Sequence, residues 1–227
     1  MKLATIVALL ALPSALAAQV GYTPERSPYR DLNTAMRMSV IAGWYAAADD
    51  AAGVLPKSGP LVGVRWLAHV GGPAEIGVRL AMVSTERSVL DPAQAAEDRL
   101  VETRDVRLGF GDVTLNFNLT GGKSWRNLAP YIQAGIGLVS DFQSRDVGGF
   151  RHGTEFAFSY GAGVRFVPAR RFELHAELGS YFYNLEYPTT YFVPGPDETS
   201  VLPAAAKRDA WRNNWTLAIG ASFHPFR

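Results

Sequence analysis

The chain has 227 residues, 22 basic and 21 acidic side chains, and no cysteine. This balanced charge argues against a nucleic-acid partner, because proteins that bind nucleic acids normally have an excess of basic residues. The lack of cysteine excludes disulfides and structural zinc sites built from cysteine. A chain of this length fits one β domain of ordinary or slightly large size.

The first 17 residues have the composition of a secretory signal peptide. Lys2 precedes an apolar run over residues 3–12, and the small-residue pattern Ala15-Leu16-Ala17 follows. The run is too short to cross a bilayer as a helix, and no later stretch approaches the necessary length. We therefore expect residues 1–17 to be removed on export and the mature chain to have no transmembrane helix.

The rest of the chain alternates between apolar and polar residues in eight segments. Residues 18–35 form a lead-in segment with two prolines and no apolar period. The eight segments cover residues 36–46, 60–69, 74–83, 106–119, 129–140, 154–167, 171–184 and 213–224. A period of two predicts strands, so residues 36–227 are expected to form one all-β domain. An even number of antiparallel strands can close on itself and leave no unpaired edge.

The connections between these segments alternate in length. Residues 47–59, 84–105, 141–153 and 185–212 form long connections, and residues 70–73, 120–128 and 168–170 form short ones. Long and short connections therefore lie at opposite ends of the molecule. Outer-membrane barrels have this habit, with short periplasmic turns and long extracellular loops.

The composition of the two strand faces indicates which face meets lipid. In residues 172–178, Phe172, Leu174 and Leu178 share one parity, whereas Glu173 and Glu177 share the other. The polar parity of the eight segments is also rich in glycine, which suits the narrow interior of an eight-stranded barrel. None of the four lysines lies in a predicted strand, although a soluble barrel would place lysine on its wet face. We therefore predict a closed, antiparallel, eight-stranded up-and-down transmembrane barrel with its apolar face toward lipid.

Aromatic residues bracket the apolar parity. Phe156 and Phe166 are ten residues apart, as are Phe172 and Phe182. At ~3.3 Å per residue and a tilt of roughly 40°, ten residues rise about 25 Å, the height of a lipid-facing band between aromatic girdles. The expected girdle consists of Trp44, Trp66, Phe156, Phe166, Phe172, Phe182, Trp215 and Phe223.

Charged residues of the inward parity form the main candidate site. They are Arg37, Arg65, Glu75, Arg79, Asp112, Arg165, Glu173, His175 and Glu177. His175 between two acids could ligate a metal or transfer protons. The four arginines on the same face favour an interior ion network with a structural or gating role. We therefore expect no catalytic residue, no metal and no cofactor.

The fourth segment breaks the common pattern. Leu108 and Phe110 lie on one parity, whereas Val113, Leu115 and Phe117 lie on the other. A bulge near residues 109–111 would reset the register. The alternative is that the upper part of this strand stands above the membrane, where alternation is not required.

These features, from about Met36 to Phe226, resemble small eight-stranded bacterial outer-membrane barrels of the OmpA and OmpX type and the opacity-protein-like surface antigens. The C-terminal stretch resembles their assembly signal, with Gly220, Phe223 and Phe226 in the expected roles. It departs from that signal in Pro225 and in Arg227 after the last aromatic residue. The resemblance implies an outer-membrane location and recognition by the barrel-assembly machinery.

The expected function is non-enzymatic. The barrel would serve a structural or surface-interaction role among outer-membrane lipid and lipopolysaccharide, with an unknown surface ligand and a lumen mostly plugged by the ion network. A narrow gated pore for small solutes or ions is the alternative. A lipid-modifying enzyme is more remote, because Thr154 stands two positions after His152 where the lipid A deacylase family has serine.

Overall fold

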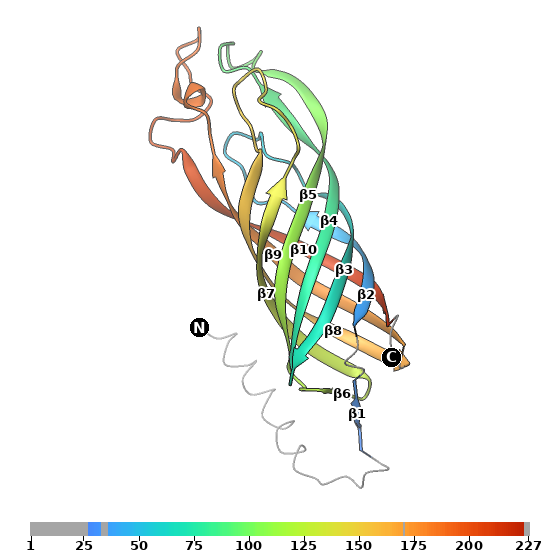
Figure 1. Cartoon of the computed structure of the whole chain (residues 1–227). Coiled ribbons are helices and arrows are strands. Elements are labelled where there is room, and N and C mark those ends of the chain that lie inside the picture. Colours follow the sequence, from blue (N-terminus) through green and yellow to red (C-terminus); the bar gives the residue numbers. More distant parts are fainter. Residues whose placement is uncertain (1–26, 33–35, 170, 225–227) are drawn as a thin grey trace, which may run out of the picture.

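The computed structural model describes residues 27–32, 36–169 and 171–224, so the predicted signal peptide and Phe226 lie outside the described residues. Within these ranges the chain forms a tall barrel with extended loops at one end (Figure 1). The strands are β1 (Tyr29–Asp31), β2 (Arg37–Ala46), β3 (Gly59–Gly71), β4 (Ala74–Leu90), β5 (Leu100–Asn118), β6 (Lys123–Trp125), β7 (Leu128–Ser140), β8 (Thr154–Ala169), β9 (Phe172–Glu186) and β10 (Asp209–Phe223). No helix in the described part of the chain is long and apolar enough to cross a membrane.

Eight of the described strands close into an antiparallel barrel. The order around the barrel is β2, β3, β4, β5, β7, β8, β9 and β10, and β10 pairs with β2 to complete the circle. Each strand pairs with its sequence neighbour in the barrel, which defines an up-and-down topology. The predicted fold is therefore confirmed.

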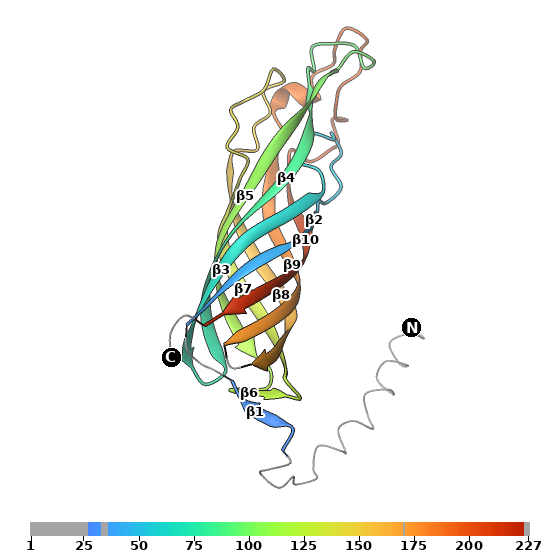
Figure 2. The ribbon, with the colours of Figure 1, turned by 90° about the vertical axis from the view of Figure 1, so that its right-hand side faces the viewer.

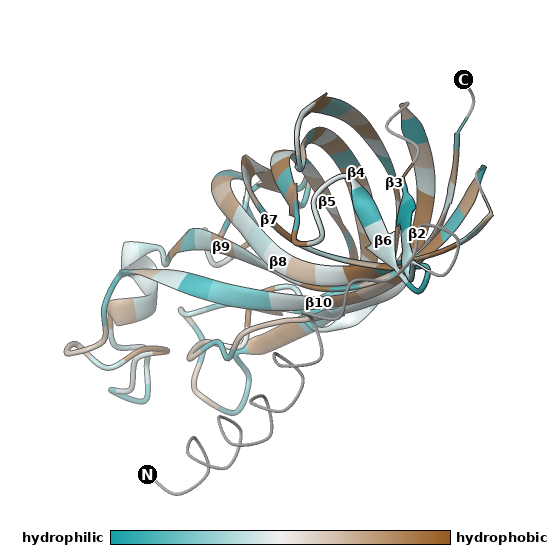
Figure 3. Cartoon of the chain, turned by 90° about the horizontal axis from the view of Figure 1, so that it is seen from below, coloured by the Kyte–Doolittle hydropathy of each residue, from teal (hydrophilic) through white to brown (hydrophobic). Residues whose placement is uncertain are grey.

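The two parities of the strands face opposite sides of the barrel wall, since exposed and buried residues alternate along them. Figure 3 shows the corresponding changes of hydropathy along the ribbons. In β9, Leu174 and Leu178 are 43% and 52% exposed, whereas Glu173 and Glu177 are 0% and 4% exposed. The other barrel strands carry exposed apolar residues in the same way, including Val40 and Ile136. A wide band of exposed apolar side chains around a closed barrel is the surface that lipid requires.

The two ends of the barrel differ, and we call them the turn end and the loop end. Short connections lie at the turn end. Four long connections lie at the loop end and are named L1 (47–58), L2 (91–99), L3 (141–153) and L4 (187–208), the last with a short 3-10 helix at Thr189–Phe192. The alternation of connection lengths expected from the sequence is present.

The strands β4 and β5 extend furthest beyond the segments that the sequence predicted. Residues 84–105 were expected to form a loop, but β4 continues to Leu90 and β5 begins at Leu100. Ser84 pairs with Arg107 and Val89 with Glu102, so a two-stranded hairpin rises above the barrel. Because the hairpin has no lipid-facing side, it needs no apolar stripe, and hydrophobic alternation gave no sign of it.

The bulge near residues 109–111, one of the two explanations considered for the fourth segment, does not occur. Pairing of β5 with both β4 and β7 is continuous there, and β5 alternates without a break. Leu108 and Phe110 point inward on the same parity as Asp112. The even-numbered residues of β5 therefore face inward on both sides of this point. The interior itself changes from polar to apolar toward the loop end.

Two short strands at the turn end had no predicted counterpart. Tyr29 pairs with Trp125 and Asp31 with Lys123, so β1 lies against β6 beneath the barrel (Figure 2). Part of the expected lead-in segment thus forms a ribbon with the turn between β5 and β7. Neither strand has an apolar face, which explains why periodicity missed them.

Candidate functional site in the barrel interior

All nine predicted interior residues lie inside the barrel, and none is more than 5% exposed. The alternation of the strands brings them there, because every inward position of β2, β3, β4, β5, β8 and β9 projects into the same narrow space. They form two layers of contacts. One layer lies near the turn end and the other at mid-height.

The layer at the turn end joins the first residues of β2 and β4 to the end of β8. Arg37 holds Glu75 through two nitrogens, at 2.8 and 2.5 Å. Arg165 reaches the same carboxylate at 3.4 Å and also donates to Asn118. Glu173 is fully buried, with Arg37 and Arg165 at 3.8 and 3.9 Å. Both contacts are ion pairs to Oε2, and they are longer than hydrogen bonds.

His224 completes this layer. Its Nε2 lies 3.4 Å from Oε1 of Glu173, and its side chain is 1% exposed. The sequence analysis had not included this residue in the network. The chain after β10 turns His224 inward, which continues the inward parity of Ser222.

The layer at mid-height centres on Glu177. Its two oxygens accept hydrogen bonds from four groups, each between 2.5 and 2.8 Å away: Arg65 Nη1, Arg79 Nη1, Gln133 Nε2 and the Tyr131 hydroxyl. A buried carboxylate is tolerated when its lone pairs are satisfied in this way. Glu177 thus ties β3, β4 and β7 to β9 across the interior.

Arg79 extends this layer to Asp112. The guanidinium donates to both carboxylate oxygens, at 3.0 and 2.8 Å, which is the bidentate geometry of strong ion pairs. Ser159 and Tyr181 donate to the same carboxylate at 2.7 and 3.3 Å. The arginine also lies over the Tyr181 ring, 5.1 Å from its centroid.

His175 takes a position that does not favour a metal. Its Nδ1 lies 3.4 Å from the Ser222 hydroxyl, and the neighbouring acids Glu173 and Glu177 are engaged by arginines. Within the described residues, no group of three histidine, cysteine or acidic side chains is placed to hold a metal ion. The arrangement is that of an ion network.

An apolar layer lies above the two ionic layers. It consists of Ile41, Tyr45, Leu61, Ala81, Val83, Leu108, Phe110, Val139, Ala157, Tyr181 and Tyr183. The ring centroids of Phe110 and Tyr181 are 4.4 Å apart, and the hydroxyls of Tyr45 and Tyr183 are hydrogen-bonded at 2.9 Å. Sequence reasoning did not anticipate this layer, although parity placed its members on the inward face.

Several network residues were missed for a simple reason. Tyr131, Gln133 and Asn118 are neutral, whereas the expected network consists of ionisable side chains. Tyr131 and Gln133 share the parity of Gly135 and Gly137 in β7. The same alternation that identified the arginines could therefore have identified them.

The predicted girdle residues lie on the outer surface near both rims. Trp44, Phe156 and Trp215 lie toward the loop end, and Phe172 and Phe223 pair with each other at the turn end. The remaining members are Trp66 and Phe166 toward the turn end and Phe182 toward the loop end. Phe182 is half-buried because it stacks on Trp211, with ring centroids 5.0 Å apart. Of the expected assembly signal, Gly220 and Phe223 lie in β10.

The residues that raised the enzyme alternative do not form a hydrogen-bonded pair. The Thr154 hydroxyl bonds to Ser140 Oγ at 2.9 Å, and His152 Nδ1 lies 3.4 Å from the carbonyl oxygen of Gly153. A nucleophile and its base would be expected to hydrogen-bond to each other. His152 belongs instead to a cavity between two loops.

The barrel, its interior ions and its exposed apolar band define the class of small membrane-spanning eight-stranded barrels. No family model and no curated protein matches the chain. Among solved structures it is similar to Neisserial surface protein A, NspA, with a TM-score of 0.51 and 12% identity over 83% of this chain and 96% of that one.

Two structures from Pseudomonas aeruginosa are also similar. The N-terminal β-barrel domain of OprF has a TM-score of 0.48 and 12% identity, covering 86% of this chain and 98% of that one. The outer membrane protein OprG has a TM-score of 0.48 and 10% identity, covering 85% and 98%. The closed eight-stranded topology and the similarity to NspA give the chain the fold of small bacterial outer-membrane barrels.

Proposed function

We propose that the chain is a non-enzymatic integral protein of a bacterial outer membrane. The turn end faces the periplasm, and L1 to L4 face the outside. This proposal is supported by the exposed apolar band and by the predicted signal peptide, which would deliver residue 18 onward to the periplasm. The outer-membrane lipids and lipopolysaccharide are its surroundings, and the barrel-assembly machinery inserts it.

The lumen is mostly closed to solutes. The observation that carries this proposal is the stacking of two ionic layers beneath an apolar layer, with Glu177 satisfied by four donors. An eight-stranded barrel has an interior just wide enough for side chains to fill. The function therefore resides in the outer surface and the loops, and the interior gives mechanical stability.

The loops are built for a fixed shape. A second apolar cluster joins L1, L3 and L4 and consists of Val54, Leu55, Phe150, Leu185, Tyr187, Tyr191 and Leu202. Asp50 accepts the backbone N–H groups of Ala52, Val54 and Leu55 and the hydroxyl of Tyr187. A preformed loop surface loses less entropy on binding, which supports a surface-interaction role.

Conductance of the refolded chain in a planar bilayer tests this proposal. We expect wild-type protein to show no steady opening. Replacing Glu173 and Glu177 by alanine should lower the free energy of unfolding by about 3–5 kcal/mol, because buried Arg65 loses its acidic partner and Arg79 loses one of its two. This variant should still be silent, since the apolar layer remains.

Opening the lumen should require removal of both kinds of layer. Adding Tyr45→Ala and Phe110→Ala to the two glutamate replacements should produce measurable ion current. The closed lumen would be wrong if the wild-type protein conducted steadily and if the replacements of Tyr45 and Phe110 did not change that conductance. This result would favour a gated pore.

A further inference from the structure

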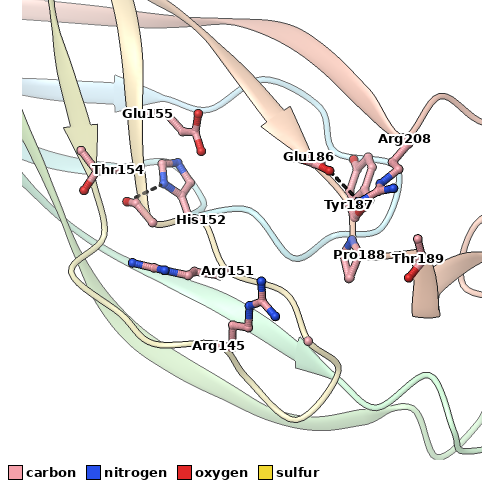
Figure 4. Close-up of a pocket in the computed structure, with 12 residues that line it drawn as sticks. Arg145, Arg151, His152, Thr154, Glu155, Glu186, Tyr187, Pro188, Thr189 and Arg208 are labelled. Atoms are coloured by element: carbon pink, nitrogen blue, oxygen red, sulfur yellow. Dashed lines mark hydrogen bonds and ion pairs between the residues drawn. The ribbon is translucent and has the colours of Figure 1, made fainter.

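A polar cavity lies between L3 and L4 at the mouth of the barrel. Its volume is about 450 Å³, and its wall includes Arg145, Arg151, His152, Glu155, Glu186 and Arg208. Figure 4 shows Arg145 and His152 on one side, facing Glu186, Tyr187 and Arg208 on the other. This volume suits a ligand of one or two sugar rings.

The walls of the cavity are held by buried contacts. Arg87 and Asp146 form an ion pair at 2.9 Å with both side chains fully buried, and Asp146 also accepts the backbone N–H of Phe150 at 2.9 Å. The Thr190 hydroxyl in L4 donates to the Gly148 carbonyl in L3 at 2.7 Å. The two loops are thus fixed to each other and to the β4–β5 hairpin, so the cavity is preformed.

His152, in the wall of this cavity, carries a buried ring nitrogen that is available as a hydrogen-bond acceptor. The side chain is 3% exposed, and its Nδ1 lies 3.4 Å from the Gly153 carbonyl, an atom that can only accept a hydrogen bond. With its proton on Nδ1, the neutral ring has a lone pair on Nε2. Among the described residues, Nε2 has no hydrogen-bond partner.

The neutral form of this histidine is favoured by its surroundings. Burial lowers the pKa of His152, and Arg87 acts in the same direction, while Asp141 and the Gly153 carbonyl oppose the shift. A ligand hydroxyl would satisfy the buried nitrogen, because an unpaired buried acceptor is costly.

The charges around the cavity favour an anion, because Arg145, Arg151 and Arg208 outnumber Glu155 and Glu186 in its wall. Arg208 is paired with Glu186 at 2.7 Å. Arg145 and Arg151 are exposed, and neither forms an ion pair within the described part of the chain. Guanidinium groups bind carboxylate and phosphate with two parallel hydrogen bonds.

We propose that the L3–L4 cavity binds a sugar that carries a carboxylate or a phosphate group. Arg145 and Arg151 bind the anionic group, His152 Nε2 accepts a hydrogen bond from a sugar hydroxyl, and Glu155 accepts from another. The inference rests on the proposed surface role, because loops that face the outside of the cell can contact extracellular glycans.

Binding of small sugars to the purified, refolded chain in detergent tests the inference. The probes are glucuronate, glucose 1-phosphate, glucose and inorganic phosphate, and calorimetry measures the affinity of each. We expect at least one of the two anionic sugars to bind about 10-fold more tightly than both glucose and phosphate. A preference for glucuronate indicates an acidic polysaccharide as the source, and a preference for glucose 1-phosphate indicates a phosphorylated glycan.

Variants separate the two halves of the site. Arg145→Ala with Arg151→Ala should reduce the binding of the anionic sugars to the level of glucose. His152→Phe keeps a ring against Tyr183, whose centroid lies 5.5 Å away, but removes the acceptor and should weaken binding several-fold. The matched control, Lys123→Ala with Arg171→Ala, removes two charges at the turn end and should bind as wild type does.

Three results would overturn the inference. They are a folded protein that binds none of the probes, one that binds glucose as tightly as the anionic sugars, and one that binds inorganic phosphate as tightly as the anionic sugars. Folding of each variant is checked by the shift in gel mobility on heating. Because the assay uses purified protein, a failure here leaves the membrane topology intact. A wrong topology would be revealed by the protease experiment described below.

Discussion

At the scale of single residues, Gly135 allows two strands to pack closely, and Asp197 fixes a contact between two loops. A Cβ built on Gly135 would lie 2.3 Å from the Val113 carbonyl oxygen and 2.9 Å from Ser159 Oγ. Real contacts are longer than this, so β7 and β5 approach closely only because Gly135 has no side chain. The lack of a side chain at Gly135 thus allows both the close approach of the two strands and the position of Ser159.

Replacing Gly135 by alanine should therefore destabilise the barrel by about 1–3 kcal/mol, the usual cost of overpacking. Gly122 is the matched control, since a Cβ there meets nothing within 4 Å. Thermal unfolding in detergent, followed by heat-dependent gel mobility, measures both variants. Equal midpoints for Gly135→Ala and wild type would show that the strands can separate to admit a methyl group.

Asp197 fixes a contact between L2 and L4 that should survive mild acid. Hydrogen bonds from the Ala96 backbone and from Thr199, with Arg99 nearby, lower the pKa of Asp197 to about 2 from its ordinary value of 3.8. The contact is therefore at full strength above pH 3.8 and is lost as the pH falls through about 2. An NMR titration of the Asp197 carboxyl carbon measures this, and a midpoint near 4 would contradict it.

At the scale of strands, the outer face of β7 contributes to the apolar band and its inner face contributes to the ion network. Ile136 in β7 is 54% exposed on the outer face, whereas Gln133 in the same strand is 5% exposed and bonds to Glu177. One strand therefore contributes both to the apolar band and to the ion network. A shift of one residue in pairing would exchange the two faces, so the register is strongly specified.

Ile136→Arg should destabilise the folded barrel in lipid bilayers by about 2–4 kcal/mol, because the charge falls near mid-height on the lipid-facing side. Val147 in L3 is 64% exposed and gives the matched control, as Val147→Arg should have little effect. Unfolding by urea in lipid vesicles provides the measurement. Similar midpoints for the two variants would mean that the outer face of β7 does not meet lipid.

At the scale of the whole molecule, the barrel carries structured loops at one end and compact turns at the other. The β4–β5 hairpin, L3 and L4 are held together by Arg87, Asp146 and Thr190. At the other end, β1 pairs with β6 across Tyr29 and Trp125. The two ends therefore differ in length and in internal contacts.

Trypsin added to intact cells should cut at the loop end and spare the turn end. Lys207 and Arg208 in L4 are exposed, as are Lys123 and Arg171 at the turn end. Mass spectrometry of the fragments should find cuts only at the loop end, after exposed residues such as Lys57, Arg145, Arg151, Lys207 or Arg208. Cells with a permeabilised outer membrane are the control and should also give cuts after Lys123 and Arg171. The reverse pattern in intact cells would mean that the barrel is inserted upside down.

The sequence by itself determined the strands, their faces and the residues that point inward. Alternation is a local property, because successive side chains of a strand always point to opposite sides. Arg37, Glu75 and Glu177 could therefore be assigned to the interior without knowledge of their neighbours. The hairpin above Ser84 and the strands β1 and β6 could not, since no face of theirs is uniformly apolar.

Only the tertiary structure decided which inward residues meet. Glu177 contacts Arg65 and Arg79, whereas Glu173 lies with Arg165 and His224. These partners come from strands far apart in the chain, and their heights depend on tilt and on register between neighbouring strands. The loop cavity around His152 has the same origin, because its walls come from L3 and L4, which no local pattern relates. Periodicity is fixed within each strand, but closure of the barrel and packing of the loops are properties of the whole chain.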